Sequence, residues 1–196
     1  MIQLTPNNTH VVVPTVSHAK VAFCGPNGTG KSTLAKIVSE HYNIPTITVT
    51  DITRVISKNI NHSGAIDLVY ESHKTRLQIE EFFAWQSFAS DRSHIDDLAE
   101  SILHNTLTDE EFAKRCVESM RSYTHIFFLD PVEYINTDYD PTSQSSLAYN
   151  RIISDLLERL LCECDNDYFY VPGFDGNLAA RSQFIIDCID QPLRLL

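Results

Sequence analysis

A glycine-rich stretch near the N-terminus has the residue types and spacing that hold the phosphates of a nucleotide. It matches the pattern G-x-x-x-x-G-K-[ST] and continues with a threonine: Gly25, Pro26, Asn27, Gly28, Thr29, Gly30, Lys31, Ser32 and Thr33. Its glycines let backbone N–H groups turn inward around phosphate oxygens. We expect Lys31 to reach the β- and γ-phosphates and the Ser32 hydroxyl to coordinate Mg²⁺. The stretch therefore predicts a site for ATP with Mg²⁺, although the sequence has no base-specifying N-K-x-D motif and does not distinguish ATP from GTP.

Three aspartates follow short stretches that have the composition of β-strands. They are Asp51 after residues 45–50, Asp91 after 88–90, and Asp130 after 124–129. The carboxyl ends of parallel strands meet at one edge of a sheet, where α/β folds bind their ligands. Asp130 follows four apolar residues, which is typical of an aspartate that holds Mg²⁺ through water. Asp91 competes for this metal role, and an ordinary Asp-Pro turn also explains Asp130, so the sequence leaves these alternatives open.

Strands and helices alternate around these residues. A strand over 19–24 runs into the glycine-rich stretch and then into a helix over 32–42, which is the context that a phosphate-binding loop needs. The patterns predict further strands over 45–50, 88–90, 124–129 and 168–171, and further helices beginning near residue 52 and over 66–86, 95–105, 109–122, 146–162 and 177–189. We therefore expect an α/β fold of three layers with a mostly parallel five-stranded sheet. Residues 18–196 would form a single domain after an extended lead-in over 1–17.

Composition and charge restrict the class of protein. The chain has 196 residues, of which 43% are hydrophobic and 21% charged, and this mixture is typical of a soluble globular domain. It contains neither an apolar run of about 18 residues nor a secretory signal, so we expect a cytoplasmic protein, in the host cytoplasm if a phage encodes it. The net charge of −11 disfavours DNA as a partner, because DNA binding depends on lysine and arginine neutralising phosphates. The sequence does not decide between a monomer and a homodimer.

The cysteines and histidines follow no metal or disulfide pattern along the sequence. Five cysteines, an odd number, argue against a disulfide framework, and Cys162 and Cys164 are too close together for a C-x-x-C zinc knuckle. None of the eight histidines belongs to an H-E-x-x-H motif. We expect His94 to lie on the surface of its helix, with a contact to substrate as the alternative. Three aromatic residues are expected in the core, with a base-stacking platform as the alternative: Phe82, Phe83 and Trp85.

Two further motifs and the order of the elements carry a resemblance to a known family. The motifs are Asp51-Ile52-Thr53-Arg54 and Ser90-Asp91-Arg92-Ser93, the second of which continues into a helix with an acidic start. Together with the phosphate-binding loop, they make residues 18–190 resemble the nucleoside and nucleotide kinases of the P-loop NTPase fold. The resemblance is strongest to ribosylnicotinamide kinase domains, thymidylate kinases and phage-encoded relatives. It implies a kinase that transfers phosphate from ATP, with Mg²⁺, to a small nucleoside, nucleotide or related acceptor.

The resemblance also implies roles for individual residues. It makes Lys31, Asp91 and Arg92 the catalytic residues, with Asp91 acting as the base or hydrogen-bond acceptor for the substrate hydroxyl, or reaching Mg²⁺ through water. Arg92 would bind the substrate or the transferring phosphoryl group. Asp51 would contact the sugar or base of the substrate, and Arg54 its phosphate or sugar. The structural alternatives are that Asp51, Asp91 or Ser93 caps a helix, that Arg54 is solvated, and that Arg92 pairs with Asp96 on the surface.

The polar stretch over 133–146 has the position of the lid in these kinases. A lid usually brings an arginine to the phosphates, but the sequence has no Arg or Lys between Arg121 and Arg151. Arg151 is therefore the candidate replacement and a further substrate contact. By the order of elements, Arg181 would lie near the adenine. Two alternatives to a small-molecule kinase stay open: a kinase of a modified base within DNA, and a nucleotide-gated switch or slow ATPase that regulates a partner, which the missing lid arginine favours.

Overall fold

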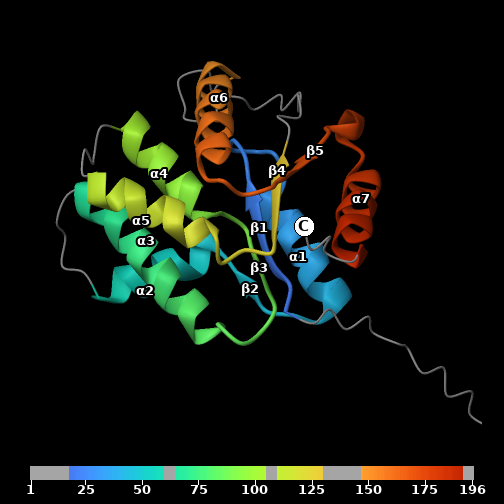
Figure 1. Ribbon diagram of the computed structural model, residues 1–196, viewed down its shortest axis with the longest axis horizontal. Helices are drawn as coiled ribbons and strands as arrows, with labels where there is room; N and C mark the ends of the chain where they lie inside the picture. Colours follow the sequence, from blue (N-terminus) through green and yellow to red (C-terminus); the bar gives the residue numbers. More distant parts are fainter. Residues whose placement is uncertain (1–17, 60–64, 105–109, 130–146, 192–196) are drawn as a thin grey trace, which may run out of the picture.

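A computed structural model describes residues 18–59, 65–104, 110–129 and 147–191 of the chain (Figure 1). In this part of the chain, the strands form one five-stranded sheet with the order β2-β3-β1-β4-β5, and every neighbouring pair is parallel. The strands are β1 (Lys20–Cys24), β2 (Thr46–Ile47), β3 (Phe88–Ser90), β4 (His125–Leu129) and β5 (Phe169–Val171). The expected α/β fold with a parallel five-stranded sheet is confirmed.

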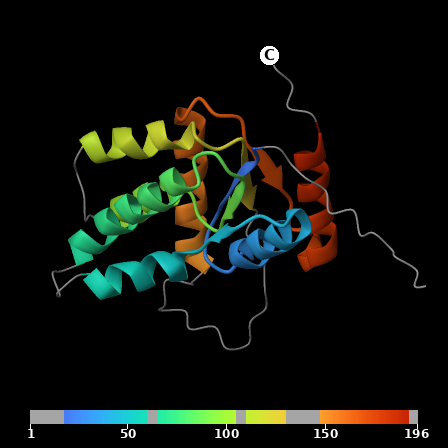
Figure 2. The same cartoon turned by 90° about the horizontal axis from the view of Figure 1, so that it is seen from below.

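Helices cover both faces of the sheet, as the two views in Figures 1 and 2 show. On one face lie α1 (Lys31–Tyr42) and α7 (Leu178–Asp190). On the other face lie α2 (Val49–Asn59), α3 (Ala65–Phe82), α4 (His94–Leu103), α5 (Glu110–Met120) and α6 (Leu147–Glu163). Successive residues of a strand point to opposite faces, so Val21 and Phe23 of β1 pack toward α1 while Ala22 and Cys24 pack toward the larger layer. Burial on both faces explains why the central strands are continuous apolar runs.

Three neighbouring strands are each followed by a helix that begins at the same edge of the sheet. The loop after β1 leads into α1, the residue after β2 leads into α2, and a short loop after β3 leads into α4. Because β2, β3 and β1 are adjacent and parallel, these helix N-termini lie close together. Helix N-termini carry partial positive charge and free N–H groups, which suits the binding of phosphate at this edge.

The second strand is shorter than predicted, and the helix after it begins earlier. The sequence predicted a strand over 45–50 with Asp51 at its carboxyl end, but β2 ends at Ile47 and α2 begins at Val49. Thr48 caps this helix: its hydroxyl accepts from the backbone N–H of Asp51 (3.1 Å) and donates to the Asp51 carboxylate (2.7 Å). These capping bonds override the strand propensity of the β-branched residues, and they put Asp51 in the first turn of α2.

Three burial predictions are wrong. Phe82 and Trp85 were expected in the core, but they are 78% and 88% exposed, because α3 ends at Phe82 and the chain then turns away. Phe83 does pack against the core. His94 was expected on a helix surface, yet its side chain is fully buried and faces two polar partners from α3 rather than water.

Several predicted features lie outside the described residues. These are the lead-in over 1–17, the candidate lid over 133–146 and the aspartate at position 130. Within the described residues, no helix is both long enough and apolar enough to cross a membrane.

Candidate nucleotide-binding and catalytic site

The loop between β1 and α1 requires glycine at specific positions. Gly25, Gly28 and Gly30 have φ angles of 144°, 79° and 89°, in the region that favours glycine. A Cβ atom on Gly25 would also lie 2.9 Å from the backbone oxygen of Leu129 in β4. The neighbouring strand therefore leaves no room for a side chain at the start of the loop, and the loop turns sharply into the N-terminus of α1.

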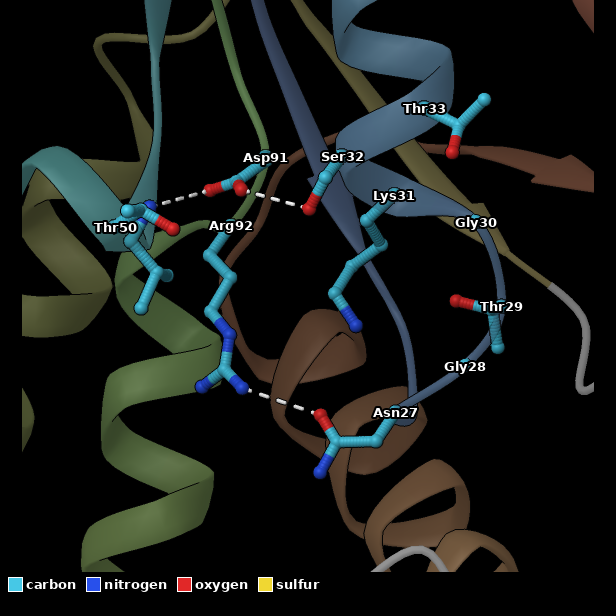
Figure 3. Close-up of a pocket in the computed structure, with 11 residues that line it drawn as sticks. Asn27, Gly28, Thr29, Gly30, Lys31, Ser32, Thr33, Thr50, Asp91 and Arg92 are labelled. Carbon is cyan, nitrogen blue, oxygen red and sulfur yellow. Dashed lines mark hydrogen bonds between the residues drawn. The ribbon is translucent and has the colours of Figure 1, made fainter. Parts of the chain in front are cut away.

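This loop forms one wall of an open cleft of about 370 Å³ (Figure 3). The opposite wall comes from the first residues of α2 and from the two residues after β3. The lining residues are Asn27, Gly28, Thr29, Gly30, Lys31, Ser32, Thr33, Val49, Thr50, Asp91 and Arg92. The volume lies within the range of small-molecule sites. The structure thus brings most of the predicted phosphate-binding residues together with Asp91 and Arg92.

The Lys31 side chain lies inside the loop and contacts its backbone. The Nζ atom donates to the backbone oxygens of Gly25 (2.6 Å) and Pro26 (2.8 Å), and the residue is buried. Burial lowers the pKa of the Lys31 ammonium group to about 8, against the opposing effect of the Asp96 carboxylate. Phosphate oxygens entering the loop would compete with the two carbonyl oxygens for this ammonium group.

Asp91 connects the start of α1 with the start of α2. Its Oδ2 atom accepts from the Ser32 hydroxyl (2.9 Å), and its Oδ1 atom accepts from the backbone N–H of Val49 (2.9 Å). A serine hydroxyl and a carboxylate in contact at the mouth of a phosphate-binding loop are oxygen donors of the kind that Mg²⁺ prefers. The donor set therefore fits the predicted metal. Asp91 also caps a helix, because it accepts a hydrogen bond from the first backbone N–H group of α2.

Arg92 reaches across the cleft and is fixed at both ends of its guanidinium group. One terminal nitrogen donates to Glu100 (2.7 Å), and the other donates to the Asn27 side-chain oxygen (3.2 Å), as Figure 3 shows for Asn27. Burial disfavours the charge, but the carboxylates of Glu100 and Asp96 raise the pKa of Arg92, so it stays protonated. The alternative in which Arg92 pairs with Asp96 on the surface is not what the structure shows: its partner is Glu100.

A buried arginine, which the sequence did not single out, supports this segment from behind. Arg76 of α3 is fully buried, and its guanidinium donates to Asp97 (3.1 Å), to the Ser90 hydroxyl (3.0 Å) and to the backbone oxygen of Arg92 (3.0 Å). It thereby fixes the backbone between β3 and α4. No local sequence signal marks Arg76, because helical periodicity alone does not identify a buried cation.

A capping box at the start of α4 connects the segment after β3 with the phosphate-binding loop. Asp96 accepts from the backbone N–H of Ser93 (2.9 Å) and from its hydroxyl (2.7 Å), and its other oxygen lies 3.4 Å from the backbone nitrogen of Gly25. The S-x-x-D spacing of Ser93 and Asp96 is a readable sign of such a cap. Ser93 thus has the capping role that the sequence offered as an alternative.

Two residues from the C-terminal helices contact the backbone of the loop. The side chain of Asn150 in α6 donates to the backbone oxygen of Asn27 (3.2 Å). Arg181 in α7 is buried, and its guanidinium donates to the backbone oxygen of Thr29 (2.6 Å). Arg181 therefore supports the loop, and a position near adenine stays a prediction.

The other predicted substrate contacts do not line the cleft. Asp51 and Arg54 form an ion pair with each other (2.9 Å), and their side chains are 48% and 62% exposed. They lie further along α2 than Thr50, which does line the cleft. Arg151 is exposed near the start of α6. Their roles as substrate contacts stay predictions.

Known proteins similar to this chain support the same assignment of fold. Short regions match curated proteins: an adenylate kinase of Bifidobacterium longum is 41% identical over 51 residues, and an adenylate kinase of Leptospira biflexa is 50% identical over 40 residues. These matches cover 26% and 20% of this chain, and only 27% and 22% of the relatives' own lengths.

Among solved structures, the YorR protein of Bacillus subtilis, in complex with phosphorylated GDP, is similar with a TM-score of 0.60. That similarity covers 87% of this chain and 95% of the other at 12% identity, so it shows the fold alone.

A family model described as an AAA domain matches residues 20–181, which include the loop, the Asp91-Arg92 segment and Arg181. The match spans most of the chain and agrees with the parallel sheet and the phosphate-binding loop. Together with the adenylate kinase matches and the fold of the YorR protein, it confirms the resemblance to P-loop nucleoside and nucleotide kinases. The chain belongs to this AAA domain family.

Proposed function

We propose that the protein is an ATP- and Mg²⁺-dependent phosphotransferase that acts on a small nucleoside or nucleotide. The observation that carries the proposal is the meeting of Ser32, Asp91 and Arg92 at the open side of the phosphate-binding loop. An arginine held over the cleft is placed to stabilise the negative charge of a transferring phosphoryl group. The similarity to adenylate kinases over short regions supports the same class of reaction.

The loop would hold the triphosphate through its backbone and through Lys31. Phosphate oxygens would replace the carbonyl oxygens of Gly25 and Pro26 as acceptors for the Lys31 ammonium group. Ser32 would hold Mg²⁺ directly and Asp91 would hold it through water. Bound there, Mg²⁺ would neutralise charge on the β- and γ-phosphates. Both oxygens of Asp91 already have partners, which favours this metal role over that of a general base.

Transfer would then depend on position and charge. An acceptor oxygen, either a nucleoside hydroxyl or a phosphate oxygen of a nucleotide, would attack the γ-phosphorus in line with the leaving oxygen of ADP, forming one P–O bond as the other breaks. Where the acceptor is a hydroxyl, its proton would leave to solvent. Arg92 would stabilise the negative charge that spreads over the transferring group. Glu100 and Asn27 hold Arg92 in place before the reaction, so little reorganisation is needed.

The acceptor would enter beside the start of α2. Val49 and Thr50 form the wall of the cleft opposite the loop. Asp51 and Arg54, further along the exposed side of α2, are our predicted contacts to the far end of the acceptor. Arg151 is our predicted substitute for a lid arginine.

The proposal is tested by measuring ADP release with ATP and Mg²⁺ in the presence of single candidate acceptors. The set comprises nucleosides, nucleoside monophosphates, ribosylnicotinamide and single-stranded DNA. Lys31→Ala removes the buried ammonium group, and Lys36→Ala is the matched control because Lys36 lies exposed on the same helix. Stimulation by a small acceptor that Lys31→Ala abolishes and Lys36→Ala preserves supports the proposal.

Two other outcomes of this experiment would indicate a different function. Stimulation by DNA alone would indicate a kinase of a base within DNA. ATP binding without stimulation by any acceptor would indicate a nucleotide-gated switch, and would contradict the phosphotransferase.

A further inference from the structure

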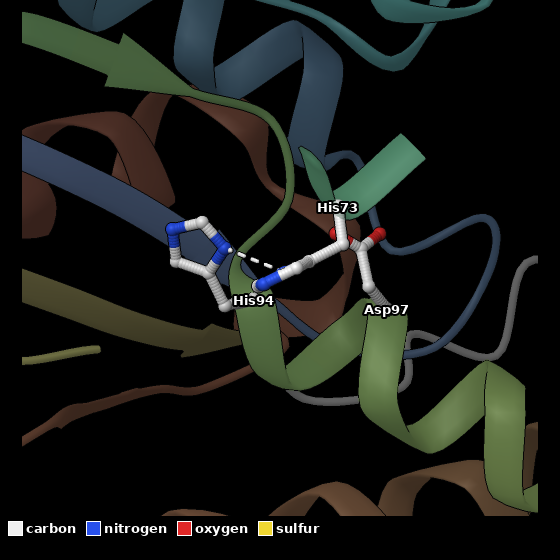
Figure 4. Close-up of side chains that lie close together, drawn as sticks. All are labelled: His73, His94 and Asp97. Carbon is white, nitrogen blue, oxygen red and sulfur yellow. Dashed lines mark hydrogen bonds between the residues drawn. The ribbon is translucent and has the colours of Figure 1, made fainter. Parts of the chain in front are cut away.

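A second cluster of side chains with coordinating atoms lies outside the nucleotide cleft, between α3, α4 and α5. His73 of α3 and His94 and Asp97 of α4 are 2%, 0% and 5% exposed. Each offers one ligand atom, and these atoms all lie within 4.8 Å of one another. Figure 4 shows the His73 ring directed toward the His94 ring, with the Asp97 carboxylate beside it. We call these three residues the histidine–aspartate cluster.

Two donor-atom distances from His73 Nδ1 match those between ligands of one ion. The Nδ1 atoms of His73 and His94 are 3.2 Å apart. Two imidazole nitrogens on a tetrahedral Zn²⁺ ion are separated by about 3.3 Å, given Zn–N distances of about 2.0–2.1 Å. The Sγ atom of Cys116 in α5 lies 3.6 Å from His73 Nδ1. A thiolate and an imidazole sharing such an ion are separated by about 3.5 Å, given a Zn–S distance of about 2.3 Å.

The His94 ring is oriented by a hydrogen bond of the kind that orients metal-binding histidines. The Nε2 atom of His94 faces the Glu80 carboxylate at 3.0 Å, and the Tyr123 hydroxyl donates to the other Glu80 oxygen (2.7 Å). A ring that donates from Nε2 to a carboxylate presents the Nδ1 lone pair to the cluster. Metal-bound histidines almost always donate their other ring N–H in this way. Arg76 likewise orients the Asp97 carboxylate.

Within the part of the chain that the structure describes, hydrogen bonds do not satisfy both ring nitrogens of His73. Its Nε2 atom is buried and has no hydrogen-bond partner among the described residues. Its Nδ1 atom faces both His94 Nδ1 and Cys116 Sγ. Buried polar atoms in native structures are usually satisfied, and an orphaned one requires an explanation. An ion held at Nδ1 would leave the Nε2 atom unpartnered, so the case for the ion rests on the spacing of the donor atoms around Nδ1.

The local charges also suit a divalent ion. Arg76 carries one positive charge, and Asp97 and Glu80 each carry a negative charge, all in the protein interior. A divalent ion bound with a Cys116 thiolate leaves this group of charges with no net charge. The Cys116 thiol would lose its proton to solvent when the metal ion binds.

We propose that His73, His94 and Asp97, with Cys116 as the fourth ligand, form a site for a divalent transition metal ion, with Zn²⁺ as the best match to the donor set. The site is closed to solvent, so its role is structural. It joins α3, α4 and α5 directly behind the Asp91-Arg92 segment, because His94 lies two residues after Arg92. The proposal does not depend on the phosphotransferase activity.

The test measures metal binding by the full chain, without an affinity tag that contains histidine. The chain is purified without chelators and its metal content is determined by mass spectrometry; the metal-free chain is then titrated with Co²⁺ and followed by visible absorption. We expect one Zn²⁺ or Co²⁺ per chain, tetrahedral d–d bands, and a thiolate-to-cobalt charge-transfer band. Folding of each variant is checked by far-ultraviolet circular dichroism.

Matched variants locate the site. His73→Asn and Cys116→Ser should lose tight binding, whereas His104→Asn and Cys162→Ser, which change exposed residues, should bind as the wild type does. Glu80→Gln should keep the stoichiometry and weaken affinity by about 10- to 100-fold. The proposal is overturned if the folded wild-type chain carries no metal and binds Co²⁺ no more tightly than His73→Asn. The cluster would then be a hydrogen-bonded group that shares protons.

Discussion

At the scale of single residues, the Lys31 ammonium group has two alternative sets of hydrogen-bond acceptors. Without nucleotide, its ammonium group donates to the backbone oxygens of Gly25 and Pro26. With nucleotide bound, phosphate oxygens would take their place, and their negative charge would favour the protonated amine. Burial lowers the pKa of Lys31 in the free protein to about 8. Above this pH the free protein has a neutral amine, which must take up a proton before it can pair with phosphate.

ATP affinity should therefore fall as pH rises above about 8, approaching about a tenfold increase in Kd for each further pH unit. Below about pH 8 the amine is already charged, so the Lys31 contribution should be constant there. Titration calorimetry between about pH 7 and about pH 9.5 measures this dependence. Lys31→Arg is the control, because a guanidinium stays charged throughout this range. An equal pH dependence in both proteins would contradict this role of Lys31.

At the scale of elements, the loop conformation depends on two glycines to different degrees. Gly25→Ala puts a Cβ atom 2.9 Å from the Leu129 backbone oxygen at a φ of 144°, so we expect a loss of more than about 3 kcal/mol and no ATP binding. Gly28 has a φ of 79°, and a Cβ atom added there would have no other atom within 4 Å, so Gly28→Ala should cost only about 1–2 kcal/mol. Urea unfolding of both variants checks this order. A Gly28→Ala variant less stable than Gly25→Ala would contradict the contact with β4.

The buried Arg76 should be a major determinant of stability. Arg76→Met keeps most of the side-chain volume but leaves the Asp97 carboxylate buried without its cation, so we expect a loss of about 3–5 kcal/mol in the free energy of unfolding. Arg115→Met changes an exposed arginine on α5 and should alter stability by less than about 0.5 kcal/mol. Chemical denaturation compares the two variants. Equal stability would mean that the Arg76 contacts contribute little.

Local patterns explain what the sequence could predict about these elements. The phosphate-binding loop and the order of strands and helices follow from short-range signals: apolar runs, helical periodicity and glycine spacing. The start of α2 depends on the local Thr48 cap and also on a bond between Val49 and Asp91, which are distant in the sequence. Arg76, His73 and His94 became buried because polar partners from three helices meet there. Helical periodicity treats such residues as surface positions, so neither their burial nor the cluster could be predicted.

At the scale of the whole molecule, nucleotide binding should stabilise the folded chain. A ligand that binds only the native state at about 100 times its Kd adds about 2.7 kcal/mol. For a chain of this size, that corresponds to a rise in Tm of about 5–10 °C. Thermal unfolding with and without ATP and Mg²⁺ measures the shift. Lys36→Ala should show the full shift and Lys31→Ala little or none; a shift of equal size in Lys31→Ala would place the nucleotide elsewhere.

The most direct test of the central claim follows the phosphate itself. The wild-type chain is incubated with Mg²⁺, ATP labelled in its γ-phosphate, and the acceptor that stimulates ADP release, and the products are separated by chromatography. We predict that the label moves to the acceptor in an amount equal to the ADP formed, and that Lys31→Ala and Arg92→Ala each lower this transfer by at least about 100-fold. Label recovered only as inorganic phosphate, with none on the acceptor, would contradict the assignment of this protein as a phosphotransferase.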